Sequence, residues 1–160
     1  MPATLQFHLT GGASNADPNA SLGGVSSSNQ LSGTPMNNLF DDVEPGEATA
    51  GDVEYRAIDI KNVGDANAVV VKAFMDPATS STDTDLAFGI EASPLGSTLS
   101  IANESTAPAG VSFANYTTGS KLTIPDIPNG NYARLWVRRT VGAGATNAAN
   151  DSGTINVEYA

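Results

Sequence analysis

The side chains that could carry out catalysis are few in this chain. The 160-residue sequence contains one histidine, His8, and no cysteine. A serine nucleophile would need that histidine close by as its base, and the Gly-x-Ser-x-Gly turn that exposes such a serine in many hydrolases is absent. A zinc site of cysteine and histidine ligands is excluded by the same shortage. The sequence therefore favours a protein that is not an enzyme and carries no cofactor, with a structural role for His8.

The densest group of acidic residues lies around the loop of residues 77–84. Asp76, Asp83 and Asp85 could offer oxygen ligands to Ca²⁺, which prefers several oxygens on a flexible loop. The order of residues departs from an EF-hand loop, because Leu86 and Ala87 stand where another ligand and a glycine belong. We interpret the segment as a solvated turn, and a metal site is the weaker alternative.

A glycine-rich segment, residues 142–147, half resembles a dinucleotide-binding fingerprint. It lacks the third glycine, and it joins two predicted strands instead of opening a helix. We expect it to be a flexible hairpin or interface loop.

Arginine and tryptophan alternate with apolar residues in the most distinctive stretch of the chain, residues 131–140. These two residue types often contribute most of the binding energy of protein interfaces. Alternatively, Trp136 fills the core while the arginines form internal ion pairs. Both interpretations stay open at this point. The candidate contact residues of the whole chain are Leu39, Phe40, Tyr55, Trp136, Arg138 and Arg139.

The net charge of −10 is unevenly distributed. All seven basic residues lie between Arg56 and Arg139, and the first 54 residues contain seven acids and no base. Such a chain repels polyanions, which argues against nucleic-acid binding and against anchoring to acidic lipids. The longest apolar run is also too short to span a bilayer. We therefore expect neither a nucleic-acid nor a membrane partner.

Strand-forming residues in short runs separated by turn signals dominate the second part of the sequence. Seven or eight strands at this spacing, without a segment of helical period, predict an all-β antiparallel β-sandwich of the immunoglobulin-like or jelly-roll-like type. A turn at residues 37–43 is the nearest helical candidate. The strand candidates are residues 4–9, 53–62, 68–75, 86–90, 97–102, 111–114, 121–124, 131–140 and 155–159.

The composition changes near Gly51. Before this residue, Gly, Ser, Asn, Asp and Pro predominate, and so little apolar surface is available that the segment would not fold alone. We predict that residues 1–51 form an extended N-terminal arm with one short strand, and that residues 52–160 form the β-sandwich domain. The arm would gain order by lying against its own sandwich or against neighbouring subunits.

Six short segments, spread over most of the chain, carry a family resemblance. They are Gly11-Gly12, Ser21–Gly24, Asn38–Val43, Gly51–Arg56, Lys61-Asn62 and Leu135–Arg139. With them the sequence resembles the small virion structural proteins of tailed bacteriophages. The resemblance implies a β-rich capsid decoration (cement) protein, or a small component of the tail or baseplate.

The resemblance also implies partners and a location. A decoration protein of this kind would bind the major capsid protein and copies of itself, commonly as a homotrimer, on the outer surface of the capsid. A carbohydrate-binding module is an alternative from another class, because many are β-sandwiches. It would need several exposed aromatic residues on one face, among which Tyr116 and Tyr132 would be candidates.

Overall fold

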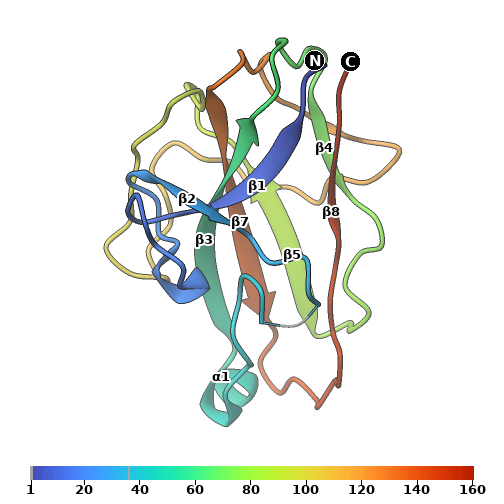
Figure 1. The fold of residues 1–160 in the computed structure, drawn as a ribbon. Helices are drawn as coiled ribbons and strands as arrows, with labels where there is room; N and C mark the ends of the chain where they lie inside the picture. The colour runs from blue at the N-terminus through green and yellow to red at the C-terminus, as the bar shows by residue number, and fades with distance from the viewer. Residues whose placement is uncertain (1, 36) are drawn as a thin grey trace.

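Two antiparallel sheets packed face to face form the fold (Figure 1). The computed structural model describes residues 2–35 and 37–160. The larger sheet has the strand order β2-β1-β3-β7-β5, and the smaller sheet has the order β6-β4-β8. The prediction of an all-β antiparallel sandwich is confirmed. The strands are β1 (Leu5–Thr10), β2 (Ser26–Gln30), β3 (Asp52–Asn62), β4 (Lys72–Met75), β5 (Thr84–Gly89), β6 (Leu122–Thr123), β7 (Tyr132–Val141) and β8 (Ile155–Glu158).

The β3–β7 pair forms the centre of the larger sheet. These are the two longest strands, and they are paired from Asp52 opposite Val141 to Lys61 opposite Tyr132. Both strands are rich in β-branched and aromatic residues, which suit a pleated and buried surface. Strand β1 pairs with the second half of β3, and β5 pairs with the second half of β7.

One face of the β3–β7 pair packs against the smaller sheet and forms the hydrophobic core. Ile58 and Ile60 of β3 lie beside Leu135 and Val137 of β7, and all four are nearly inaccessible to solvent. The smaller sheet contributes Ala73 and other buried apolar residues. Because successive side chains of a strand point to opposite faces of the sheet, every second residue of β3 and β7 faces this core.

The opposite face of the pair is also covered, although no sheet lies on it. The covering layer consists of residues 11–25 and 91–115. Arg134 donates hydrogen bonds to the carbonyl oxygens of Gly24 and Leu99, and the Tyr132 hydroxyl donates to the carbonyl oxygen of Ser97. Gly23, at φ +90°, passes so near Leu99 that a Cβ atom would lie 2.1 Å from its carbonyl oxygen. Only glycine fits there.

The N-terminal segment differs from the predicted arm with one short strand. It contains two strands, and β1 lies inside the larger sheet between β2 and β3. Buried hydroxyls fasten the intervening loop, because Ser21 donates to the carbonyl oxygen of Ala57 and accepts from the amide of Thr10. The segment adds β1 and β2 to the larger sheet, and its apolar side chains, among them Leu5, Phe7 and Leu39, pack against the core. Residues 1 and 36 of the predicted arm lie outside the described residues.

Several predicted strands differ in detail from the structure. Residues 97–102 and 111–114 form only isolated bridges. Their backbone groups bond to single residues such as Leu22 and Phe88 and do not pair with a continuous strand. Strand β4 begins at Lys72 instead of residue 68, because Val70 has a φ of 55° and its amide donates to the carboxylate of Asp126.

Helical structure is confined to short pieces. The helix α1 (Pro45–Ala50) follows the predicted turn at residues 37–43 and begins with a capping box, in which Glu44 and Glu47 satisfy each other's amides. A 3₁₀ turn, η1 (Pro18–Ala20), lies in the covering layer. No helix among the described residues is long and apolar enough to cross a membrane.

Candidate functional site

Trp136, the most distinctive of the predicted contact residues, has no exposed surface. It lies on the face of β7 that the covering layer encloses, between Arg134 and Arg138 on the same face. Its indole Nε1 has no hydrogen-bond partner among the described residues. Of the two interpretations that the sequence left open, the structure supports the interior role for this residue.

Tyr55 and Arg138 face each other across β3 and β7 on the same covered face. Phe113 of the covering layer packs on both, with its ring 5.4 Å from the ring of Tyr55 and 5.4 Å from the Arg138 guanidinium. Arg138 also lies 4.0 Å from a carboxylate oxygen of Asp85 and is about one-third exposed. These two contact candidates therefore hold the covering layer in place, and Arg138 also reaches the surface.

A cluster of buried charges lies on the core face near α1. Glu54 and Arg139 stand opposite each other on β3 and β7, and the Nε atom of Arg139 donates to Glu54 at 2.6 Å. Arg56 lies two residues further along β3. Its guanidinium is 3.7 Å from a carboxylate oxygen of Glu54 and 2.6 Å from one of Glu104. Arg56, Glu54 and Arg139 are at most 6% exposed. Buried charges of both signs in contact reduce the large cost of burying each alone.

Phe40 covers this cluster. Its ring lies 5.3 Å from the guanidinium of Arg56 and 5.0 Å from that of Arg139, at cation–π distance from both. Arg139 also donates to the carbonyl oxygen of Asp41, and Leu39 is buried in the core. The predicted contact residues Leu39, Phe40 and Arg139 thus meet in one place, where they fasten the segment before α1 to the sandwich.

Burial raises the pKa of the two buried acids in the β3–β7 pair, Glu54 and Asp59. Loss of hydration raises the pKa of Glu54, and the nearby Arg139 opposes this rise. Loss of hydration likewise raises the pKa of Asp59, whose carboxylate accepts hydrogen bonds from Arg134 at 2.6 and 3.1 Å. In both acids burial causes the rise, and each carboxylate is already bound by an arginine, so the shift gives no reason to assign a catalytic acid.

The structure does not bring together the three acids proposed as a weak metal site. Asp83 accepts hydrogen bonds from the amide and hydroxyl of Thr146, which lower its pKa. Asp85 accepts a hydrogen bond from the side chain of Asn115. Asp83 therefore ties the loop of residues 77–84 to the glycine-rich loop of residues 142–147, which is consistent with a solvated turn.

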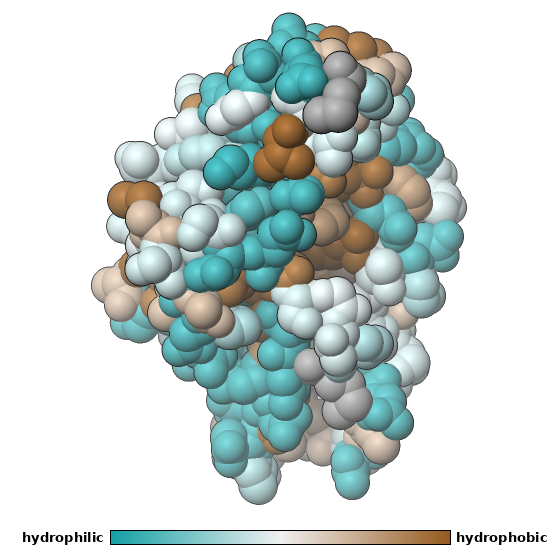
Figure 2. All heavy atoms as spheres, viewed as in Figure 1, coloured by the Kyte–Doolittle hydropathy of each residue, from teal (hydrophilic) through white to brown (hydrophobic). Residues whose placement is uncertain are grey.

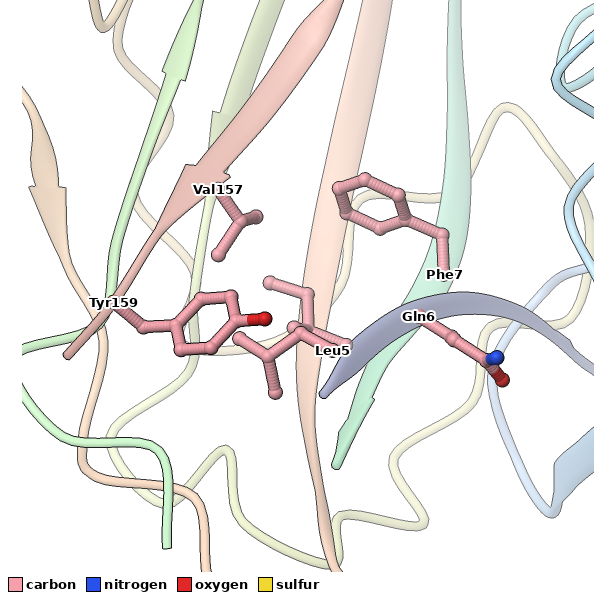
Figure 3. Close-up of a pocket in the computed structure, with 6 residues that line it drawn as sticks. Leu5, Gln6, Phe7, Val157 and Tyr159 are labelled. Carbon is pink, nitrogen blue, oxygen red and sulfur yellow. The ribbon is translucent and has the colours of Figure 1, made fainter. Parts of the chain in front are cut away.

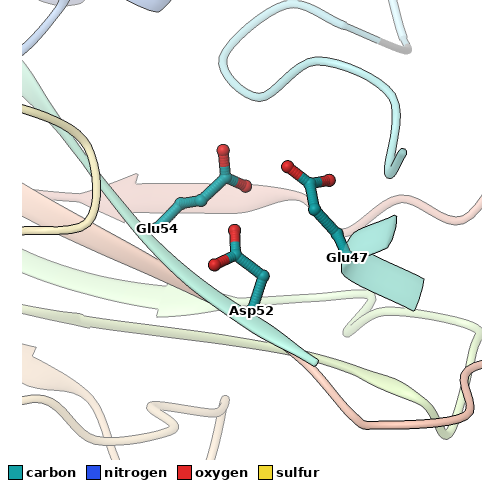
Figure 4. A group of neighbouring side chains, drawn as sticks. All are labelled: Glu47, Asp52 and Glu54. Carbon is teal, nitrogen blue, oxygen red and sulfur yellow. The ribbon is translucent and has the colours of Figure 1, made fainter. Parts of the chain in front are cut away.

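A different trio of carboxylates comes within metal-binding distance in the described residues. Glu47 of α1 and Asp52 and Glu54 of β3 point toward one another, with one oxygen of each within 4.8 Å of the others (Figure 4). Two of the three already have partners, because Glu47 accepts from the amide of Glu44 and Glu54 is bound by Arg139. The arginine already supplies a positive charge where a cation would bind.

A hollow of about 100 Å³ opens between β1 and β8 (Figure 3). We call it the β1–β8 crevice. Leu5 and Phe7 reach into it from β1, and Val157 and Tyr159 face them from the C-terminal strand. Figure 2 shows apolar atoms recessed near the middle of this side of the molecule, bordered by polar surface. Its lining residues are Leu5, Gln6, Phe7, Ile60, Val157 and Tyr159, none of which is charged.

Sequence reasoning missed the crevice. The alternation of Ile155, Val157 and Tyr159 predicts the strand, but it does not reveal that this strand is the last in its sheet. Comparisons of the chain with protein-family models, with curated proteins and with solved structures found no match.

Proposed function

We propose that this chain is a non-enzymatic structural protein of a bacteriophage virion, and specifically a capsid decoration (cement) protein. The observation that supports this proposal is the distribution of its reactive side chains. The buried arginines and acids bind one another, and an apolar crevice opens at the surface between β1 and β8. Such a surface suits association with another protein better than the chemical conversion of a small molecule.

The size of the hollows supports the same conclusion. The β1–β8 crevice has a volume of about 100 Å³, and a second hollow, which Met75 and Leu86 help to line, has a volume of about 50 Å³. Pockets for drug-sized ligands and cofactors are typically about 300–1,000 Å³. A hollow of this size accommodates one or two side chains of a protein partner, which is what an assembly component requires.

The proposed partners are the major capsid protein and further copies of this chain, in a homotrimer on the outer surface of the capsid. The resemblance of the sequence to small phage virion proteins supports this placement, and the net charge of −10 opposes contact with packaged nucleic acid. Reinforcement would be passive: a protein that binds only the mature lattice stabilises that lattice by mass action. Many weak contacts on one particle would add through multivalency.

The number of copies per particle tests this proposal. We expect the protein to be present in purified virions, in many copies and at repeated positions over the capsid in a cryo-electron map. Shells that lack it should lose integrity at a lower temperature, and the purified protein should restore their stability. A few copies confined to the tail or baseplate would favour that alternative, and absence from virions would refute both placements.

Carbohydrate binding gains little support from the structure. Tyr116 packs against Phe88, and the hydroxyl of Tyr132 is bound to Ser97. Tyr159 is the only aromatic residue among the large, well-exposed apolar side chains of the described chain. Stacking on a sugar would need several exposed rings on one face, which the described residues do not provide.

A further inference from the structure

Strand β8 is an edge of the smaller sheet, and no strand of the described residues pairs with its outer side. In the order β6-β4-β8, the strand β8 pairs with β4 on one side only. Thr154 and Ala160, which flank the strand, exchange backbone hydrogen bonds with the β4 side. Even-numbered residues therefore turn their peptide groups toward β4, and odd-numbered residues turn theirs toward the open edge.

The peptide groups at the open edge belong to Ile155, Val157 and Tyr159. None of the three has a backbone hydrogen-bond partner within residues 2–35 and 37–160. Their side chains are on the inner face of the sheet, where Ile155 and Val157 pack against the core and Tyr159 lines the β1–β8 crevice. A row of free donors and acceptors thus runs along an apolar hollow. An exposed strand edge of this kind is a template for another strand.

We propose that the β1–β8 crevice is an acceptor site for one extended strand of a partner protein, which adds to β8 as a fourth strand of the smaller sheet. Strand addition uses main-chain hydrogen bonds for affinity and pockets for alternate side chains for specificity. Here the main-chain groups are those of Ile155, Val157 and Tyr159, and the pocket is the hollow that Leu5 and Phe7 line. The inference rests on this geometry alone and does not require the virion assignment.

The charge distribution decides the chemistry of the occupant. The chain carries a net charge of −10, yet none of the residues that line the crevice is charged. A charged side chain inserted there would be buried without a counterion, at a large energetic cost. The complementary segment is therefore uncharged and apolar at every second position, where its side chains enter the hollow. At the intervening positions its side chains face solvent, and basic residues there would complement the acidic protein.

The geometry also favours one extended segment over the edge of a second copy. Side chains from β1 and from β8 face each other across the hollow, so the occupant lies between two walls (Figure 3). A single strand needs about 4.8 Å beside β8. Self-association is therefore an alternative outcome of the test and not the proposal.

Amide hydrogen exchange of the full chain provides a direct test. The probe is a short peptide that alternates valine and threonine, with a lysine at each end for solubility. The peptide should slow the exchange of the Ile155, Val157 and Tyr159 amides by at least about tenfold, while the β4-facing amides of Asn156 and Glu158 change little. A control peptide with glutamate in place of valine should have no effect.

Two matched substitutions separate binding from folding. Val157→Pro removes one outward amide and no hydrogen bond to β4, and edge strands tolerate proline at such positions. It should abolish the protection, whereas Val157→Ala, which keeps the amide, should retain most of it. Tyr159→Lys should weaken binding, and Val25→Lys, a change of an exposed apolar residue remote from the crevice, should not.

Three results would overturn the proposal. The first is unchanged exchange at Ile155 and Val157 with the peptide in large excess, in a protein whose spectrum is that of the folded state. The second is equal protection by the glutamate peptide or in the folded Val157→Pro variant. The third is protection of these amides without peptide, together with a doubled molecular mass, which would identify a second copy as the occupant.

Discussion

The β3–β7 pair and the edge of β8 are both built from alternating apolar and polar residues, but they differ in what remains unsatisfied. In the pair, β1, β5 and the backbone of the covering layer supply further hydrogen bonds along the outer sides of the two strands, and both faces are covered. Its charged residues are matched, Glu54 with Arg139 and Asp59 with Arg134. At β8 one row of peptide groups faces an open apolar crevice.

The contrast between the paired strands and the open edge indicates which part of the molecule can bind a partner. Arginine, tryptophan and buried carboxylates are the side chains that usually indicate a functional site. Here they hold the covering layer and the segment before α1 against the two faces of the larger sheet. The binding potential lies instead with ordinary residues such as Val157, because their backbone is unpaired. Regions of low local stability and unsatisfied backbone are the ones that can change on binding.

The largest effect is expected from breaking the Arg134–Asp59 ion pair. Arg134→Met would leave the carboxylate of Asp59 buried without a partner and would remove the donor to the carbonyl oxygens of Gly24 and Leu99. We expect a loss of about 3–5 kcal/mol in the free energy of unfolding. Urea denaturation followed by circular dichroism at neutral pH would measure it.

The double variant Arg134→Met with Asp59→Asn is the control, because it also removes the stranded charge. The double variant should recover part of the lost unfolding free energy. The rest of the loss should come from the missing hydrogen bonds between Arg134 and the covering layer. If the free energy of unfolding of Arg134→Met falls by less than about 1 kcal/mol, the ion pair contributes little to stability and this prediction is wrong.

An intermediate effect is expected from the pH dependence of Glu54. Burial raises the pKa of Glu54 in the folded protein above its ordinary value of 4.5. Its contribution to stability is therefore fully present below about pH 4.5 and is lost as the pH rises through the folded-state pKa. Relative to Glu54→Gln, which does not titrate, the unchanged protein should gain stability as the pH falls from 7 toward 4.5, by less than the loss expected for Arg134→Met.

The measurement is the difference in urea unfolding free energy between the two proteins at several pH values. Subtracting the variant removes the contribution of the other acids, including the general repulsion of a chain with net charge −10. A difference that moves in the opposite direction would mean that Arg139 holds the pKa of Glu54 below its ordinary value.

The smallest effect on stability is expected at the open edge. Tyr159 is 40% exposed, and its side chain closes only one end of the crevice. Tyr159→Ser should change the free energy of unfolding by less than about 0.5 kcal/mol. A loss comparable to that of Arg134→Met would show that the crevice is part of the core, and the contrast between the two regions would disappear.

The sequence indicates the strands well where local patterning decides them. Residues 53–62 and 131–140 alternate strongly, and both strands appear within one residue of the predicted bounds. Local pattern could not identify the partners. Arg56 meets Glu104, which is 48 residues away, and nothing near either residue specifies that contact.

The N-terminal segment shows a second limit of local reasoning. Its glycines and small polar residues are typical of a flexible arm. In the structure Gly11 and Gly23 both have positive φ and come so near another backbone that no side chain would fit. Glycine therefore serves close packing there, and the doubled Gly11-Gly12 and Gly23-Gly24 pairs were the available signal. The covered positions of Tyr55 and Trp136 could not be predicted either, because residues 91–115, which pack over them, are distant in the sequence.

The enclosure of Trp136 has a spectroscopic consequence. It is the single tryptophan of the chain, it is inaccessible to water, and its indole nitrogen has no partner among the described residues. Its fluorescence should therefore be blue-shifted and poorly quenched by iodide while residues 91–115 stay in place. Any opening of that layer would shift the emission to the red, so the protein contains an intrinsic optical probe of its own covering.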